Sequence, residues 1–279
     1  MDVKRVGTTI RNRIAMDFFL APRFDVYDRL LATAVGHGYT CETIAETWER
    51  IKSGTLAPRT FVLRNDVDTD PRTARALWEI DRRHGVRATY YFRLRTLDLD
   101  LMREMDAVGT EASYHYEEVA TVAKRRGLRS RADVDANMAE IQDLFASNLA
   151  DLRNRTGLAM RTVASHGDFA NRAIKTANHA LLADTAFRDR VGVDLETYDE
   201  AFTSHITMRA ADLGSPQLFA PSDPIDALRA GSAFVYVLVH PRQWQVDRLG
   251  NLAEDVLRAR EGLVFSARQR RYSGVGPAA

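Results

Sequence analysis

Acidic and histidine side chains follow four apolar segments of this sequence, at the point where each segment ends. In chain order they are Asp66 and Asp68, then His115, then His166 and Asp168, and finally His240. Carboxylate oxygens and imidazole nitrogens are suitable ligands for Zn²⁺, Fe²⁺, Co²⁺ or Ni²⁺. A bound dication would turn the repulsion among clustered acids into coordination and hold them ionised. If the four ends meet in space, they predict one metal site.

The apolar segments that carry these residues have the composition of buried β-strands. "FVLRND" and "FVYVLVHP" are nearly continuous apolar runs, and "VRATYYFRL" is rich in β-branched and aromatic residues. Amphipathic helical segments alternate with them, which is typical of a parallel sheet covered by helices. In that architecture the carboxyl ends of the strands carry the active site. The four segment ends are therefore expected to converge.

Periodicity and capping residues place the intervening helices. Residues 1–55 are expected to be mainly helical, because "FDVYDRLLATAVGHGY" and "CETIAETWERIKSG" have apolar residues at helical spacing. Asp133 is expected to cap a later long helix, and residues 171–190 are expected to form another.

Length and composition restrict the class of protein. The 279 residues are expected to form a single domain, since α/β barrels of this length are often single domains. The formal net charge is +1 and the basic residues are scattered, which argues against a nucleic-acid partner. No apolar run approaches the roughly 18 residues that a membrane span needs.

The first residues and the cysteine content indicate the compartment. The N-terminal segment lacks the continuous apolar core of a signal peptide, so a cytoplasmic protein is expected. Cys41 is the one cysteine, which excludes an internal disulfide and a cysteine-based zinc site. A buried, unreactive thiol is expected there. The oligomeric state stays open at this level.

The motifs and their order are similar to those of a known enzyme family. "LRNDVDTDPRTARALWEIDRRHGVRATYYFRL" resembles the first motif region of the NodB-type polysaccharide deacetylases, the family 4 carbohydrate esterases. "SYHYE", "SHGD" and "LVHPRQW" resemble the later motifs of one divergent branch, in the same order. The resemblance covers residues 60–245, with residues 1–55 as a helical extension packed on this core. It implies a distorted (β/α) barrel, commonly of seven strands, with extra N-terminal helices.

The resemblance also implies roles for individual residues. Asp66 would be the general base and His240 the general acid, while Asp68 and His115 would bind the metal. Such a site hydrolyses an N-acyl or O-acyl group on a sugar with the help of one divalent ion. Zn²⁺ is the first expectation for that ion, and Fe²⁺, Co²⁺ and Ni²⁺ are alternatives.

The sequence departs from the family pattern at two positions. The family's second motif has another histidine four residues after the first, where this chain has Val119. We expect His166 to supply the third protein ligand, with Glu117 or Glu118 as the alternative. Asn65 stands before the first aspartate, where this branch often has histidine, so a titrating role is lost there.

Further side chains are expected to line the substrate pocket or support the ligands. These are Asn65, Arg93, Tyr116, Asp168 and Trp244. Asp168 can equally cap the helix that begins near Asn171. The expected substrate is a small molecule or glycan, for example a nucleotide-linked or lipid-linked amino sugar that is an intracellular precursor of surface polysaccharide.

Two other functions fit the same residues. A C–N hydrolase for a small non-sugar amide would use the same site, in a closed pocket too small for a hexose. Alternatively, the missing second histidine would leave a catalytically degenerate carbohydrate-binding protein. The metal content of the purified protein separates this last function from the two enzymatic ones.

Overall fold

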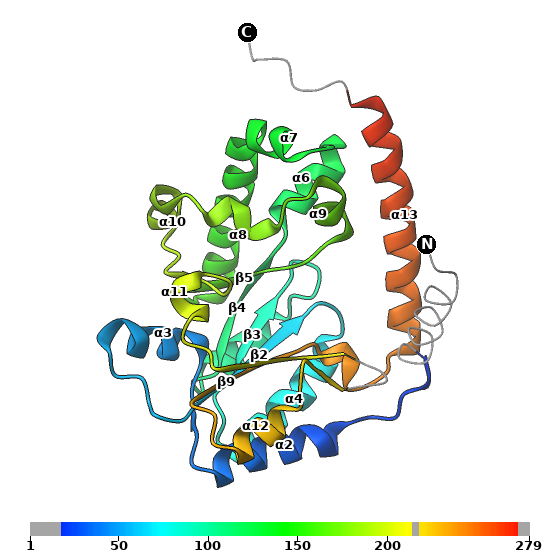
Figure 1. The fold of residues 1–279 in the computed structure, drawn as a ribbon. Coiled ribbons are helices and arrows are strands. Elements are labelled where there is room, and N and C mark those ends of the chain that lie inside the picture. Colours follow the sequence, from blue (N-terminus) through cyan, green and yellow to red (C-terminus); the bar gives the residue numbers. More distant parts are fainter. Residues whose placement is uncertain (1–17, 214–217, 273–279) are drawn as a thin grey trace.

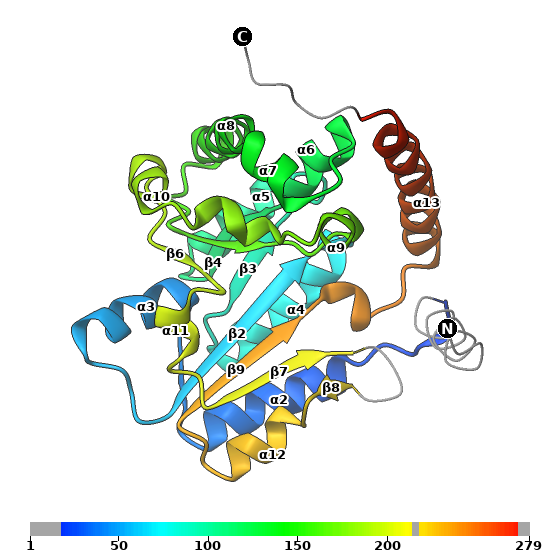
Figure 2. The same cartoon turned by 45° about the horizontal axis from the view of Figure 1, so that its top comes forward.

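One mostly parallel β-sheet organises the molecule. The structure is a computed structural model that describes residues 18–213 and 218–272. Along the sheet the strand order is β6-β5-β4-β3-β2-β9-β7-β8, and β1 pairs with β2. Within these residues the pairings are parallel except that of β7 with β8. The sheet curls into a half-barrel, and β6 and β8 stand at its two open ends (Figure 2).

The strands that carry the predicted site residues lie in the inner part of this sheet. The strand bounds are β1 (Thr40–Cys41), β2 (Thr60–Val67), β3 (Thr89–Phe92), β4 (Glu111–Tyr116), β5 (Thr162–Ser165), β6 (Leu195–Glu196), β7 (Met208–Asp212), β8 (Phe219–Ala220) and β9 (Phe234–Val239).

Helices cover the outer face of the sheet in two groups. Figure 1 shows α2, α4 and α12 together on one side, and α6, α7 and α8 on the other. The bounds are α2 (Phe24–Gly36), α3 (Ile44–Ser53), α4 (Pro71–His84), α5 (Leu99–Asp106), α6 (Glu118–Arg126), α7 (Arg131–Ala136), α8 (Met138–Thr156), α9 (Phe169–Ile174), η1 (Asn178–Leu182), α10 (Thr185–Val191), α11 (Glu200–Thr203), α12 (Pro224–Arg229), η2 (Pro241–Gln243) and α13 (Arg248–Arg271).

Alternation along β2 separates a packing face from a chemical face. Phe61, Leu63 and Val67 enter the large core beneath the outer helices. Val62 instead enters a smaller cluster inside the curl of the sheet, with Tyr91. Because successive strand residues point to opposite faces, Arg64 and Asp66 share the inner face with Val62. The inner face therefore presents polar side chains toward the end of the strand.

The expected parallel sheet covered by helices is confirmed, but the barrel is not closed. The described strands form an open path of eight, with β1 attached to β2, instead of a ring of seven. The end strand β8 runs antiparallel to β7, so the parallel arrangement of the sheet stops at β7.

Two helix predictions were wrong in detail. Residues 171–190 form three short helical segments, because Lys175 adopts a left-handed conformation (φ 55°) that ends α9 and Asp184 caps α10 anew. Ser130, not Asp133, is the cap of α7, and its hydroxyl accepts a hydrogen bond from the Asp133 amide. The long helix α8 then begins separately.

The N-terminal region contains the two expected helices, and also the short strand β1. The helix α2 buries Tyr27, Leu30 and Leu31 against the large core. Burial raises the pKa of Cys41 to about 12, which agrees with an unreactive thiol. Residues 1–17 and 273–279 of the predicted single domain lie outside the described residues. Among the described residues, no helix is both long enough and apolar enough to span a membrane.

Candidate active site

The ends of β2, β4, β5 and β9 meet at one edge of the sheet. Asn65 on β2 pairs with Val239 on β9. The residues that follow them, Asp66 and His240, are therefore neighbours. Tyr116 on β4 pairs with Ser165 on β5, and a glutamate and a histidine follow in the same way. The parallel register therefore brings together the acids and histidines that follow these strands.

Asp68 lies where two imidazole rings converge. Its Oδ1 atom is 3.2 Å from His115 Nε2 and 3.5 Å from His166 Nε2. This oxygen is buried and accepts no hydrogen bond of normal geometry. Burial acts to raise the pKa of Asp68, but His166 and His115 outweigh burial and hold the pKa well below its usual range. A buried, ionised oxygen with free lone pairs is a position for a cation.

The outer partners of the two histidines leave both Nε2 atoms facing Asp68. His115 Nδ1 lies 2.9 Å from the carbonyl oxygen of Ala164, which can only accept, so Nδ1 carries the hydrogen. His166 Nδ1 lies 3.2 Å from Glu117 Oε2 without the geometry of a hydrogen bond, and the negative charge of this carboxylate favours hydrogen on Nδ1. When a ring is neutral with its hydrogen on Nδ1, the Nε2 lone pair faces Asp68 and can coordinate a metal ion.

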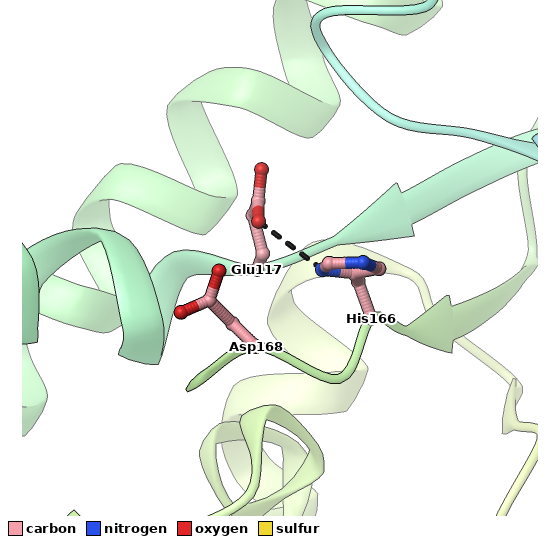
Figure 3. Close-up of side chains that lie close together, drawn as sticks. All are labelled: Glu117, His166 and Asp168. Carbon is pink, nitrogen blue, oxygen red and sulfur yellow. Dashed lines mark ion pairs between the residues drawn. The ribbon is translucent and has the colours of Figure 1, made fainter. Parts of the chain in front are cut away.

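A second group of donor atoms lies on the other side of His166. Ligand atoms of Glu117, His166 and Asp168 all lie within 4.8 Å of one another, so this group could hold a metal ion (Figure 3). Both carboxylates already have cationic partners. Arg93 Nη2 is 2.8 Å from each Glu117 oxygen, and Lys124 Nζ is 3.2 Å from Asp168 Oδ2. A metal ion here would have to compete with these two cations.

Asp66 is held by a buried arginine. Arg64 donates from Nε to Oδ1 and from Nη2 to Oδ2 of Asp66, each at 2.7 Å. This bidentate pair fixes the plane of the carboxylate, and Oδ2 lies 3.4 Å from His115 Nε2. Burial acts to raise the pKa of Asp66, but Arg64 and His115 outweigh burial and lower it. The carboxylate is therefore ionised.

His240 forms a tight pair with Asp212, the last residue of β7. Asp212 Oδ1 lies 2.6 Å from His240 Nδ1, and Oδ2 accepts from the His240 backbone amide at 2.7 Å. Burial acts to lower the pKa of His240, but Asp212, Asp68 and Asp66 outweigh burial and raise it to about 9. The imidazole is therefore protonated at neutral pH and can act as an acid.

Trp244 supports this pair from a buried position. Its side chain is fully buried, with its ring 5.1 Å from Tyr27 and 5.9 Å from Phe219. The indole Nε1 donates to Asp212 Oδ2 at 3.0 Å. The indole therefore positions Asp212, and the substrate contact of Trp244 stays a prediction.

Asn65 and Tyr116 were also expected near the substrate, and both are buried in the fold. Asn65 precedes Asp66 on β2, so alternation turns its side chain to the opposite face, next to Tyr27. Tyr116 is fully buried, with its ring 5.1 Å from that of Phe145 in the large core. Neither side chain faces the converging histidines.

Arg93 and Asp168 do lie at the site, with partners that define what they do. Arg93 is buried and holds Glu117, as described above. Asp168 caps α9, because its Oδ1 accepts from the Ala170 amide at 2.8 Å. Its other oxygen faces Lys124, so Asp168 is both a helix cap and a neighbour of His166.

Glu118, one alternative for the third metal ligand, points away from the site. Its carboxyl group accepts hydrogen bonds from Tyr114 and Asn148 in the core. Burial raises its pKa to about 7. This leaves Glu117 and His166 as the residues that can complete the group around Asp68.

Sequence reasoning missed Arg64 and Asp212. Arg64 lies two positions before Asp66 in a buried strand, so the alternation of side chains already places both on one face. Asp212 is the acidic last residue of β7, which is the same pattern that identified the other strand ends. Both signals were present in the sequence, but neither residue belongs to the motifs that identified the others.

Comparisons with known proteins give one solved structure to report. Neither a protein-family model nor a curated protein matches the sequence. The Streptococcus pyogenes deacetylase PplD in complex with acetate aligns over 84% of this chain and 85% of that chain. The sequence identity is 14% and the TM-score is 0.42, a likeness too distant to support a functional argument. The functional argument therefore depends on the site itself.

Proposed function

We propose that this protein is a metal-dependent hydrolase that removes an acyl group from the nitrogen of a sugar or sugar derivative. The observation that carries the proposal is the oxygen of Asp68, buried without a hydrogen bond and faced by the Nε2 atoms of His115 and His166. The motif resemblance implies the reaction class, and the contacts of Asp68 support the proposal.

The residues present fit a divalent ion. Asp68, His115 and His166 would provide one carboxylate and two imidazoles, a set suited to Zn²⁺ with positions left for water and substrate. The alternative position beside Glu117 is disfavoured, because Arg93 already neutralises that carboxylate. A divalent ion would supply Lewis acidity toward the acyl carbonyl and a lowered pKa for the attacking water.

The remaining steps belong to two other pairs. Asp66, kept ionised and oriented by Arg64, would accept the proton of the attacking water. His240, protonated beside Asp212, would donate a proton to the amine as the C–N bond breaks. The proposed base would lie on β2, and the proposed acid would follow β9, the adjacent strand of the sheet.

The test combines metal content with acyl release. We expect about one divalent ion per chain and acetate release from N-acetylated amino sugars and short glycans, both abolished by chelator. Asp68→Ala should lose the metal and the activity. Asp226→Asn is the matched control, since Asp226 is exposed on α12 away from the site and should leave both unchanged. Full activity after exhaustive metal removal would overturn the proposal.

A further inference from the structure

A groove runs between the body of the protein and the long helix α13. Figure 1 shows α13 along the edge of the molecule, and the helix packs on α6. Two cavities lie beneath it, and we name them together the α13 groove. One, of about 320 Å³, is lined by Asp68, Arg95 and Leu257 among others. The other, of about 500 Å³, is also lined by Arg95 and Leu257. The two cavities are therefore neighbours along the helix, and the smaller one reaches the proposed metal ligand.

Six of the thirteen residues that line the larger cavity are basic. They are Arg93, Arg95, Lys124, Arg125, Arg260 and Arg268. The acidic residues in its lining are Glu117 and Glu261. Its apolar lining residues include Val264 and Phe265 of α13.

Four of the six cations already have carboxylate partners. Arg93 contacts Glu117, Arg95 contacts Glu254, Lys124 contacts Asp168 and Glu261, and Arg125 contacts Glu140. Subtracting these five acids from six cations leaves a surplus of one positive charge. Arg260 and Arg268 have no carboxylate partner among the described residues. These two arginines carry the surplus.

Arg260 and Arg268 are positioned for an extended anion. Arg268 donates to the carbonyl oxygen of Lys124 at 3.0 Å, which anchors it at the groove wall. The two residues are eight positions apart on α13, or about 12 Å along the helix axis. Guanidinium groups bind phosphate oxygens with paired hydrogen bonds. Each guanidinium group stands on a long side chain, so the two can reach toward each other and contact one diphosphate ester, one phosphate each.

We propose that the α13 groove binds the diphosphate portion of the substrate, so that the acylated sugar at the other end reaches Asp68. This inference rests on the proposed function for its account of the sugar, but diphosphate binding can be measured without any hydrolysis. The apolar wall would pack against the organic part of the ester, either a nucleoside or a lipid chain.

The test is calorimetric titration of the full-length protein with inorganic pyrophosphate, uridine diphosphate and farnesyl diphosphate. We expect binding of pyrophosphate, and tighter binding of whichever ester has the matching organic group. Arg260→Ala combined with Arg268→Ala should weaken binding about tenfold or more, the scale of a lost charge-assisted hydrogen bond. Arg260→Ala alone, at an exposed position, should give a smaller loss in the same direction. Arg270→Ala, exposed at the end of the same helix, is the matched control and should change nothing.

Asp68→Ala separates this groove from the metal site. Binding by the groove survives this substitution, whereas pyrophosphate bound to a metal ion at Asp68 is lost. Absence of binding to wild-type protein, loss in Asp68→Ala, or unchanged binding in the double arginine variant would each overturn the inference. Diphosphate binding without acyl release would contradict the proposed function instead and leave the groove assignment intact.

Discussion

Replacing Asp212 by asparagine should disable the proposed acid without disturbing the metal ligands. In the wild type, Asp212 accepts three hydrogen bonds, from His240 Nδ1, the His240 amide and Trp244 Nε1. Asparagine has one acceptor oxygen, so its amide NH₂ must face one of these donors. When the oxygen keeps the two donors at Oδ2, the NH₂ faces His240 Nδ1 and requires the neutral ring with hydrogen on Nε2.

The size of the effect follows from the raised pKa of His240. The rise from the ordinary 6.5 to about 9 corresponds to about 3 kcal/mol of preference for the protonated ring. Removing Asp212 should return the pKa toward 6.5 or below, so at pH 8 the ring changes from mostly charged to mostly neutral. Loss of general-acid catalysis and of the correct tautomer lowers turnover by roughly 10² to 10⁴.

Two leaving groups make the assay specific. An N-acetyl amide needs a proton on its amine before the bond breaks, whereas 4-nitrophenyl acetate releases a stable phenolate. Asp212→Asn should therefore lose most of its amidase activity and keep most of its esterase activity, with unchanged metal content. Nuclear magnetic resonance titration of His240 should show the lowered pKa. Equal losses on both substrates, or an unaltered pKa, would refute this account of the pair.

Three further perturbations test other parts of the structure. Arg64→Met leaves the Asp66 carboxylate buried without its partner and should cost about 3–5 kcal/mol of stability in urea denaturation; a loss below about 1 kcal/mol would show that the pair is dispensable. Asp81 accepts from Tyr27 and Tyr90 in the core, and burial raises its pKa from 3.8 to about 7. The protonated Asp81 therefore stabilises the fold fully below pH 3.8, and this contribution of about 4 kcal/mol is lost as pH rises through about 7. Asp81→Asn should flatten the dependence of stability on pH in that range, and an unchanged slope would contradict this. His166→Ala should lose stoichiometric metal, while Glu117→Gln should weaken metal affinity only 10–100-fold, as expected for an outer partner of a ligand; the reverse order would make Glu117 the ligand.

The strand ends could be predicted from the sequence because parallel strands share one direction. Once β2, β4, β5 and β9 were identified, the acids and histidines after them had to gather at one edge. Helix boundaries near Lys175 were less predictable, since a left-handed residue other than glycine gives no clear signal. The open sheet also could not be read from the sequence, because closure depends on pairing between β6 and the opposite edge.

The substrate-contact predictions show where sequence motifs mislead. Asn65 and Tyr116 each stand next to a site residue on a strand, and adjacent strand residues point to opposite faces. Proximity in the sequence therefore placed them on the wrong side of the sheet. The same alternation, applied two residues apart, would have identified Arg64. The face of the sheet to which a strand residue points was a better guide to its place in the site than membership of a motif.

The central claim is the position of the metal ion, and anomalous diffraction from crystals of the metal-loaded protein tests it most directly. The account predicts one peak within about 2.0–2.3 Å of Asp68 and of the Nε2 atoms of His115 and His166. A peak between Glu117 and Asp168, on the Nδ1 side of His166, or no peak in protein that hydrolyses the amide, would contradict it.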